Sequence, residues 1–192
     1  MSTEINLTGI IEGIFIAGVA GIQVYEKLKT YFKDKNKKHN IKDLNMMDLK
    51  IYEKLAECKT KYRADRCIFF QFHNGEVFLN NNSILKMSLT HESNNDGITQ
   101  LKNEFQTIHI SSAPNFIHKL IENETFQLDT HKTDEDFICN FKFYGVESVM
   151  VHRVEDEKKK VIGFVCMCFH TALQHRDFEP LKDLSEHIGF LI

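Results

Sequence analysis

Several sequence patterns that mark common functional classes are missing from this chain of 192 residues. No pair among its five cysteines has CxxC spacing, and none of its ten histidines forms an HExxH or a His-Cys finger spacing. A glycine-rich phosphate loop is also missing. The net charge of −3 gives no reason to expect nucleic-acid binding. We therefore expect no metal site and no nucleic-acid partner.

The cysteines are odd in number and lie at positions 58, 67, 139, 166 and 168. Cys166 and Cys168 alternate along an expected strand, so their side chains should point the same way. Unpaired thiols fit a reducing compartment, which favours a cytoplasmic location. Thiols in core strands behave as small hydrophobic groups, and Cys139 is the cysteine that we expect to be most accessible. We expect a noncatalytic protein.

Positive charge is absent from residues 1–26, which contain an apolar run from Leu7 to Val24. Small residues recur every fourth position in this run and would share one face of a helix, as in paired membrane helices; they are Gly9, Gly13, Ala17 and Gly21. Lysines follow at once, at Lys27, Lys29, Lys33, Lys35, Lys37 and Lys38. This asymmetry predicts a single-pass helix with its C-terminal side in the cytoplasm, and lysines that face anionic lipid headgroups.

Two features of the run keep other interpretations open. Its length of about 18 residues is near the short end of what spans a bilayer, and Glu12 would be costly in lipid. The same small-residue face suits a helix buried in a protein bundle or one lying on a membrane surface. The pattern does not match a cleaved signal peptide, since the positive n-region is missing.

Beyond the run, the sequence divides into a basic linker over residues 26–40 and one domain over residues 41–192. Residues 41–62 form an expected amphipathic helix with an apolar seam at Leu44, Met47, Ile51, Leu55, Cys58 and Tyr62. The seam fits a helix packed on its own domain, or a coiled coil that continues from a paired membrane helix.

The remaining periodicity predicts an α+β fold, one antiparallel sheet with helices on its faces. A turn is expected at His73-Asn74-Gly75. The expected strands cover residues 66–72, 83–92, 125–128, 146–154 and 160–170. The expected helices cover residues 114–120, 134–144 and 178–192.

Residues 41–192 resemble a GAF domain in four places. Ala64-Asp65-Arg66 is similar to the family's "ADR" lead-in, and Gly145-Val146-Glu147-Ser148 to its "G-I-x-S" strand entry. Val161–Val165 resembles the "V-I-G-V-L" strand, and Phe178 with Leu181 and Leu184 resembles the closing helix. Gly145 is expected to end a helix with positive φ, and Gly163 to allow a close backbone approach.

The resemblance implies a ligand pocket between the sheet and the crossing segments. The residues that would line it here are His109, Phe116, Phe137, Phe141, Ser148 and His152. Aromatic walls with a few polar groups suit a small molecule, and the alternative is that these aromatic residues fill the core. The Asn-Lys-Phe-Asp-Glu signature of cyclic-nucleotide GAF domains is not present, so the ligand stays unknown and no cofactor is expected.

These patterns together predict a membrane-tethered sensor or scaffold module that forms homo-oligomers and binds a small ligand or a partner protein. A partner protein is expected because no kinase or cyclase output domain follows the closing helix. The alternative is a structural assembly protein, for example a virus-particle component, that uses its N-terminal helix in a protein bundle.

Overall fold

The computed structural model describes residue 27 and residues 41–77, 83–172 and 177–192. The apolar run, its small-residue stripe (Gly9, Gly13, Ala17 and Gly21) and all of the lysine cluster except Lys27 lie outside these ranges. Within them, no helix has both the length and the hydropathy needed to cross a membrane. The membrane helix therefore stays a prediction from sequence. The chain divides into two units, Met1–Asp43 and Leu44–Ile192.

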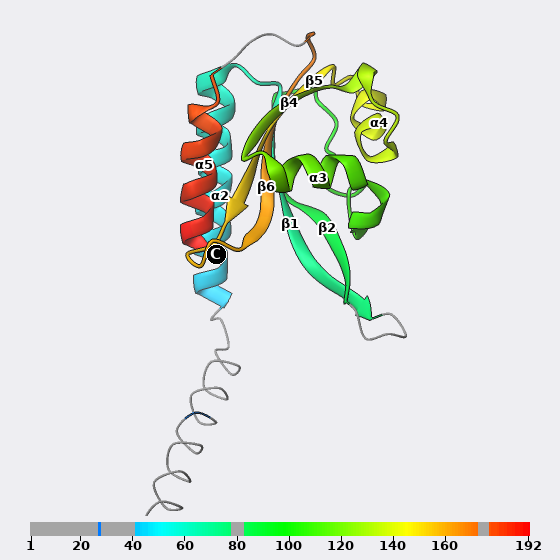
Figure 1. Ribbon diagram of the computed structural model, residues 1–192. Coiled ribbons are helices and arrows are strands. Elements are labelled where there is room, and N and C mark those ends of the chain that lie inside the picture. The colour runs from blue at the N-terminus through cyan, green and yellow to red at the C-terminus, as the bar shows by residue number, and fades with distance from the viewer. Residues whose placement is uncertain (1–26, 28–40, 78–82, 173–176) are drawn as a thin grey trace, which may run out of the picture. The chain divides into compact units, whose positions relative to one another are not determined.

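The second unit is built on one six-stranded antiparallel sheet with the strand order β3-β2-β1-β6-β5-β4 (Figure 1). Its strands are β1 (Arg66–Val77), β2 (Ser83–Asn94), β3 (Ile108–His109), β4 (Thr125–Asp129), β5 (Ser148–Glu155) and β6 (Val161–Phe169). Together with the flanking helices this is the α+β architecture expected from the sequence.

Two helices cover each face of the sheet. α2 (Ile41–Tyr62) and α5 (Glu179–Leu191) lie on one side, and α3 (Pro114–Glu122) and α4 (Asp136–Phe143) on the other, as the cyan and red helices and the green and yellow helices of Figure 1 show. Short 3-10 turns, η1 (Ile110–Ser112) and η2 (Thr130–Lys132), precede α3 and follow β4. Each face has its own apolar cluster, because both sets of alternating side chains in the central strands are buried.

The α2 helix has the predicted bounds, and its seam packs on its own domain. Ile51 and Leu55 are fully buried and Cys58 is nearly so, whereas Leu44 is 37% exposed. The three buried residues join the cluster that α5 also covers. This placement matches the first of the two interpretations of the seam. The coiled-coil alternative gains no support from these residues.

The Ala64-Asp65-Arg66 segment has a structural role at the start of β1. The backbone N–H of Asp65 donates to the carbonyl of Cys168 at 3.0 Å, and its carboxylate accepts from the N–H of His170 at 2.7 Å. The carbonyl of Asp65 accepts from the N–H of Asn95 at 2.9 Å. One residue thus ties the start of β1 to the end of β6 and to the loop after β2.

Both glycine predictions are confirmed. Gly145 has a φ of +76° just after α4, a conformation that L-residues with side chains rarely adopt. A Cβ on Gly163 would lie 2.1 Å from the carbonyl oxygen of Phe70, so only glycine lets β6 approach β1 there.

One local prediction is wrong, and one short strand was not predicted. The strand β1 does not turn at His73-Asn74-Gly75 but continues to Val77, which pairs with Ser83. Backbone pairing with β2 therefore overrides the local turn preference of the Asn-Gly pair. The two-residue strand β3 was not predicted, because two residues are too few to produce a periodicity.

Candidate functional site

A cleft of about 770 Å³ lies beside the edge strand β4, on the part of the sheet flanked by α3 and α4. We call it the α3–β4 cleft. It is lined from α3, β4, η2, the segment before α4 and α4 itself, by Asn115, Phe116, His118, Lys119, Gln127, Leu128, Asp129, Lys132, Thr133, Asp134, Glu135 and Ile138. Five segments of the chain must therefore be in place before the cleft exists.

Glu135 positions the two helices that border this cleft. Its carboxylate accepts from the backbone N–H groups of Asn115 at 2.7 Å and of Phe116 at 3.0 Å. The N-cap residue of α3, Ala113, offers no side-chain acceptor. A carboxylate from the segment before α4 therefore satisfies free N–H groups at the start of α3, where negative charge is favourable.

The remaining walls of the cleft combine apolar and charged groups. Phe116 and Ile138 are buried and belong to the core cluster, and Leu128 packs against that cluster. Asp129 pairs with Lys132 at 3.1 Å, and the backbone N–H of His131 donates to its carboxylate at 2.9 Å. That hydrogen bond, with help from Lys132, lowers the pKa of Asp129, which keeps the carboxylate ionised.

One polar atom of a cleft-lining residue has no partner. The Nε2 amide nitrogen of Gln127 is buried and makes no hydrogen bond among the residues that the structure describes. A buried N–H group without an acceptor costs about 1–3 kcal/mol. Gln127 pairs with Met150 of β5 and alternates with Phe126 and Leu128, which pack toward α3 and α4, so its side chain points to the opposite face of the sheet and not into the cleft.

The structure brings the three predicted phenylalanines together. Phe116 lines the α3–β4 cleft, and its ring centroid lies 5.0 Å from that of Phe137. Phe137 in turn lies 5.5 Å from Phe141 in an edge-to-face arrangement. All three are at least 98% buried, so they occupy the core position that the alternative interpretation gave them. Their role in ligand binding stays a prediction.

The other three predicted residues lie elsewhere. His109 is exposed on β3, where it pairs with Lys86. In β5, Val149 and Val151 pack toward α3 and α4, so the alternating residues Ser148 and His152 point to the opposite face. The expectation that these two side chains face the aromatic segments is therefore wrong.

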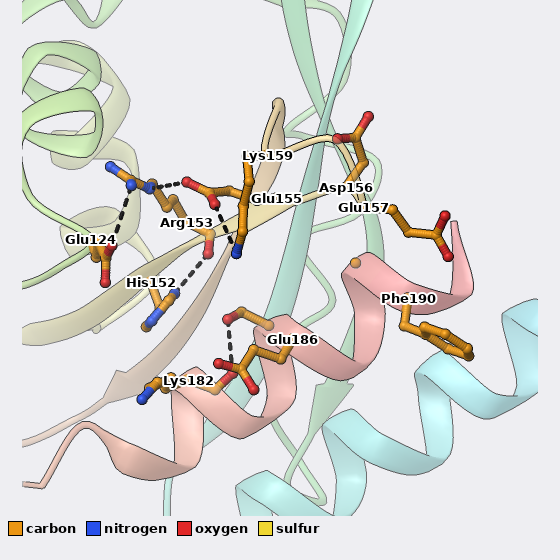
Figure 2. A pocket seen from close by; sticks show the side chains of 12 residues that line it. Glu124, His152, Arg153, Glu155, Asp156, Glu157, Lys159, Lys182, Glu186 and Phe190 are labelled. Atoms are coloured by element: carbon orange, nitrogen blue, oxygen red, sulfur yellow. Dashed lines mark hydrogen bonds and ion pairs between the residues drawn. The ribbon is translucent and has the colours of Figure 1, made fainter.

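Both residues on that opposite face have defined partners. The hydroxyl of Ser148 donates to the carbonyl of Thr171 at 2.9 Å. His152 lines a second cleft, between β5 and α5, which Figure 2 shows.

Sequence reasoning missed Glu135 and Asp129. The acidic stretch before α4 was visible in the sequence, but its contact with α3 spans 20 residues and no short-range pattern reports it.

The thiols are placed as the sequence predicted. Cys58, Cys67, Cys166 and Cys168 are buried and Cys139 is partly exposed, and all five are free. Burial raises the pKa of Cys168 to about 12. No group of three or more His, Cys, Asp or Glu side chains in the described ranges has a metal-binding arrangement.

No protein-family model and no curated protein matches the sequence. Solved structures do match. The phycocyanobilin-bound GAF domain of a cyanobacterial phytochrome aligns with 87% of this chain and 90% of its own, at a TM-score of 0.57 and 11% identity. The blue-light absorbing PixJ GAF domain of Thermosynechococcus elongatus aligns with 77% of this chain and 83% of its own, at a TM-score of 0.57 and 12% identity. A photoproduct-state GAF domain from Synechocystis aligns with 74% of this chain and 90% of its own, at a TM-score of 0.55 and 12% identity. The domain therefore has a GAF-like fold.

Proposed function

We propose that this protein is a noncatalytic GAF-like sensor or scaffold module that binds a small organic ligand in the α3–β4 cleft. The observation that carries the proposal is the cleft itself, about 770 Å³, at the place where the sheet meets the crossing segments. Ligand sites in proteins typically occupy about 300–1,000 Å³. The resemblance to GAF domains supports a ligand on this side of the sheet.

The lining residues favour a ligand with an apolar body and a few polar groups. Phe116, Leu128 and Ile138 supply apolar contact. Asp129 and Lys132 supply the charged groups of the lining. Among the structural neighbours, one bears phycocyanobilin and another biliverdin, so bilins belong among the compounds tested.

The experiment is a thermal-shift screen of the full chain against nucleotides, bilins and common metabolites. A ligand that binds only the folded state raises its stability, by about 2.7 kcal/mol at a concentration 100-fold above Kd. A concentration-dependent rise in melting temperature is expected for at least one compound. If none stabilises the chain, a scaffold role replaces the sensor role.

The sequence adds a membrane tether, a homo-oligomer and a partner protein to the proposal. The tether and the oligomer rest on the apolar run and its small-residue stripe, and the alternative is an assembly protein that packs the same helix in a bundle. Native mass measurement of the full chain with and without detergent separates the two. A chain that stays soluble and assembled without detergent contradicts the tether.

A further inference from the structure

A second cleft, of about 310 Å³, lies on the opposite face of the sheet, between α5 and the end of β5 with the turn that follows it (Figure 2). We call it the α5 cleft. Its walls include His152, Arg153 and Glu155 of β5 and Lys182, Glu186 and Phe190 of α5. No residue of the α3–β4 cleft contributes to it.

His152 presents a hydrogen-bond acceptor to this cleft. Its side chain is 7% exposed, and its Nδ1–H donates to the carbonyl oxygen of Arg153 at 2.6 Å. A carbonyl can only accept, so in the neutral ring Nε2 carries the lone pair. Burial lowers the pKa of His152, which favours this neutral form. No described residue makes a hydrogen bond to Nε2.

Most of the charged groups around the cleft are already paired. Arg153 contacts Glu155 at 2.7 Å and Glu124 at 3.4 Å, and Lys159 lies 3.8 Å from Glu155. The carboxylate of Asp156 accepts from the backbone N–H groups of residues 158 and 160. These groups form the upper wall in Figure 2 and have little capacity left for a ligand.

Two charged residues of α5 that line the same cleft are different. Lys182 and Glu186 are one helical turn apart, and within the described part of the chain neither is in an ion pair. Together with Nε2 of His152 they leave one cation, one anion and one neutral acceptor free on α5 and β5. Glu157, in the turn after β5, also lines the cleft and is in no ion pair among the described residues, so the cleft has one free cation and two free carboxylates. A purely cationic ligand would leave Lys182 unpaired and repel it. A purely anionic ligand would face Glu186 and a lone pair on His152.

We propose that the α5 cleft binds a small zwitterion of the α-amino acid class. Its ammonium donates to Nε2 of His152 and to the carboxylate of Glu186, and its carboxylate pairs with Lys182. Phe190, which is 76% exposed at the rim, offers an apolar surface to the amino acid side chain. This site is independent of the ligand proposed for the α3–β4 cleft.

The test is isothermal titration calorimetry of the full chain with three probes of one carbon skeleton: L-leucine, 3-methylbutylamine and 4-methylpentanoate. The two analogues each lack one of the charged groups. Leucine should bind. Each analogue should bind at least about tenfold more weakly, because it lacks one of the two charged groups that contact the cleft; a tenfold change corresponds to about 1.4 kcal/mol. Equal affinity for all three probes, or no heat from leucine up to about 10 mM, overturns the proposal.

Variants of the exposed side of α5 locate the site. Glu186→Gln and Lys182→Gln should each weaken leucine binding about tenfold. Lys182→Gln should also remove the preference for leucine over 3-methylbutylamine. Asp183→Asn is the matched control, since Asp183 lies on the same helix but lines a different cleft. If Asp183→Asn weakens binding as much as Glu186→Gln does, leucine does not bind in the α5 cleft. Failure here leaves the α3–β4 proposal untouched.

Discussion

Gly189 of α5 lies directly against the backbone of Glu155 in β5. A Cβ atom added at position 189 would be 2.0 Å from the carbonyl oxygen of Glu155. Glycine inside a helix costs about 1 kcal/mol relative to alanine, so helix propensity alone favours a larger residue here. The contact explains why glycine is needed: it sets how closely the helix approaches the strand beside the α5 cleft.

The first prediction follows from this contact. Gly189→Ala should lower the free energy of unfolding by about 2 kcal/mol, since the clash is with backbone and outweighs the gain in propensity. Urea denaturation measures the change. Phe190→Ala, at the exposed neighbouring position, is the control and should change stability by no more than about 0.5 kcal/mol. A Gly189→Ala variant as stable as the wild type would contradict the close approach.

The second prediction concerns the carboxylate that caps α3. Glu135→Ala leaves the N–H groups of Asn115 and Phe116 without their acceptor and should cost about 1–2 kcal/mol. Amide hydrogen exchange at these two positions should become faster. Asp134→Ala, one residue earlier and exposed, is the matched control. Unchanged exchange in Glu135→Ala would show that the cap does not hold the helix.

The third prediction is a pH dependence of stability. His91 is 7% exposed and its ring contacts those of Tyr52 and Phe69. Burial lowers its pKa despite a contact with Asp48. Burial lowers the pKa of His152 in the same way. The unfolded chain therefore binds more protons than the folded chain just below a pH of about 6.5, so stability falls as the pH drops through this range.

The measurement is the melting temperature between pH 7 and pH 5. Replacing both histidines by glutamine should reduce the loss on acidification, because the depressed pKa values are then absent. His109→Gln changes an exposed histidine and serves as the control. An equal loss in the double variant and the wild type would contradict the role of burial.

The fourth prediction ranks the thiols. With a pKa of about 12, Cys168 is ionised to only about one part in 10⁴ at pH 8, and its side chain is inaccessible. Iodoacetamide should therefore label Cys139 well before Cys168 in the folded chain. Mass spectrometry of the labelled peptides gives both rates. Similar rates under native conditions, with both increased alike by urea, would contradict the placement of Cys168 in the core.

Sequence patterns were most informative where one face of an element is buried. The helix from Ile41 to Tyr62 followed from its seam, and Gly145 and Gly163 followed from helix-end and strand patterns. In β5 the limit was physical: its first five residues are all buried, so alternation shows which side chains share a face but not which face that is. For that reason Ser148 and His152 were placed on the wrong side.

The α3–β4 cleft was beyond sequence reasoning for a related reason. Two of its lining residues, Glu135 and Phe116, come from segments that meet only in the tertiary fold. Of the six predicted pocket residues, Phe116 alone lines it.

The central claim is that a small ligand occupies the α3–β4 cleft, and one comparison tests it most directly. Asn115 is exposed and lines the cleft, and only its backbone N–H donates to Glu135. Asn115→Trp should therefore fill the cleft without removing a core contact or the hydrogen bond to Glu135. Lys142→Trp, on the exposed side of α4, is the control. The measurement is the melting-temperature rise caused by the compound that most stabilises the wild type. We predict that the rise is retained in Lys142→Trp and lost in Asn115→Trp. An equal rise in both variants would contradict binding in this cleft.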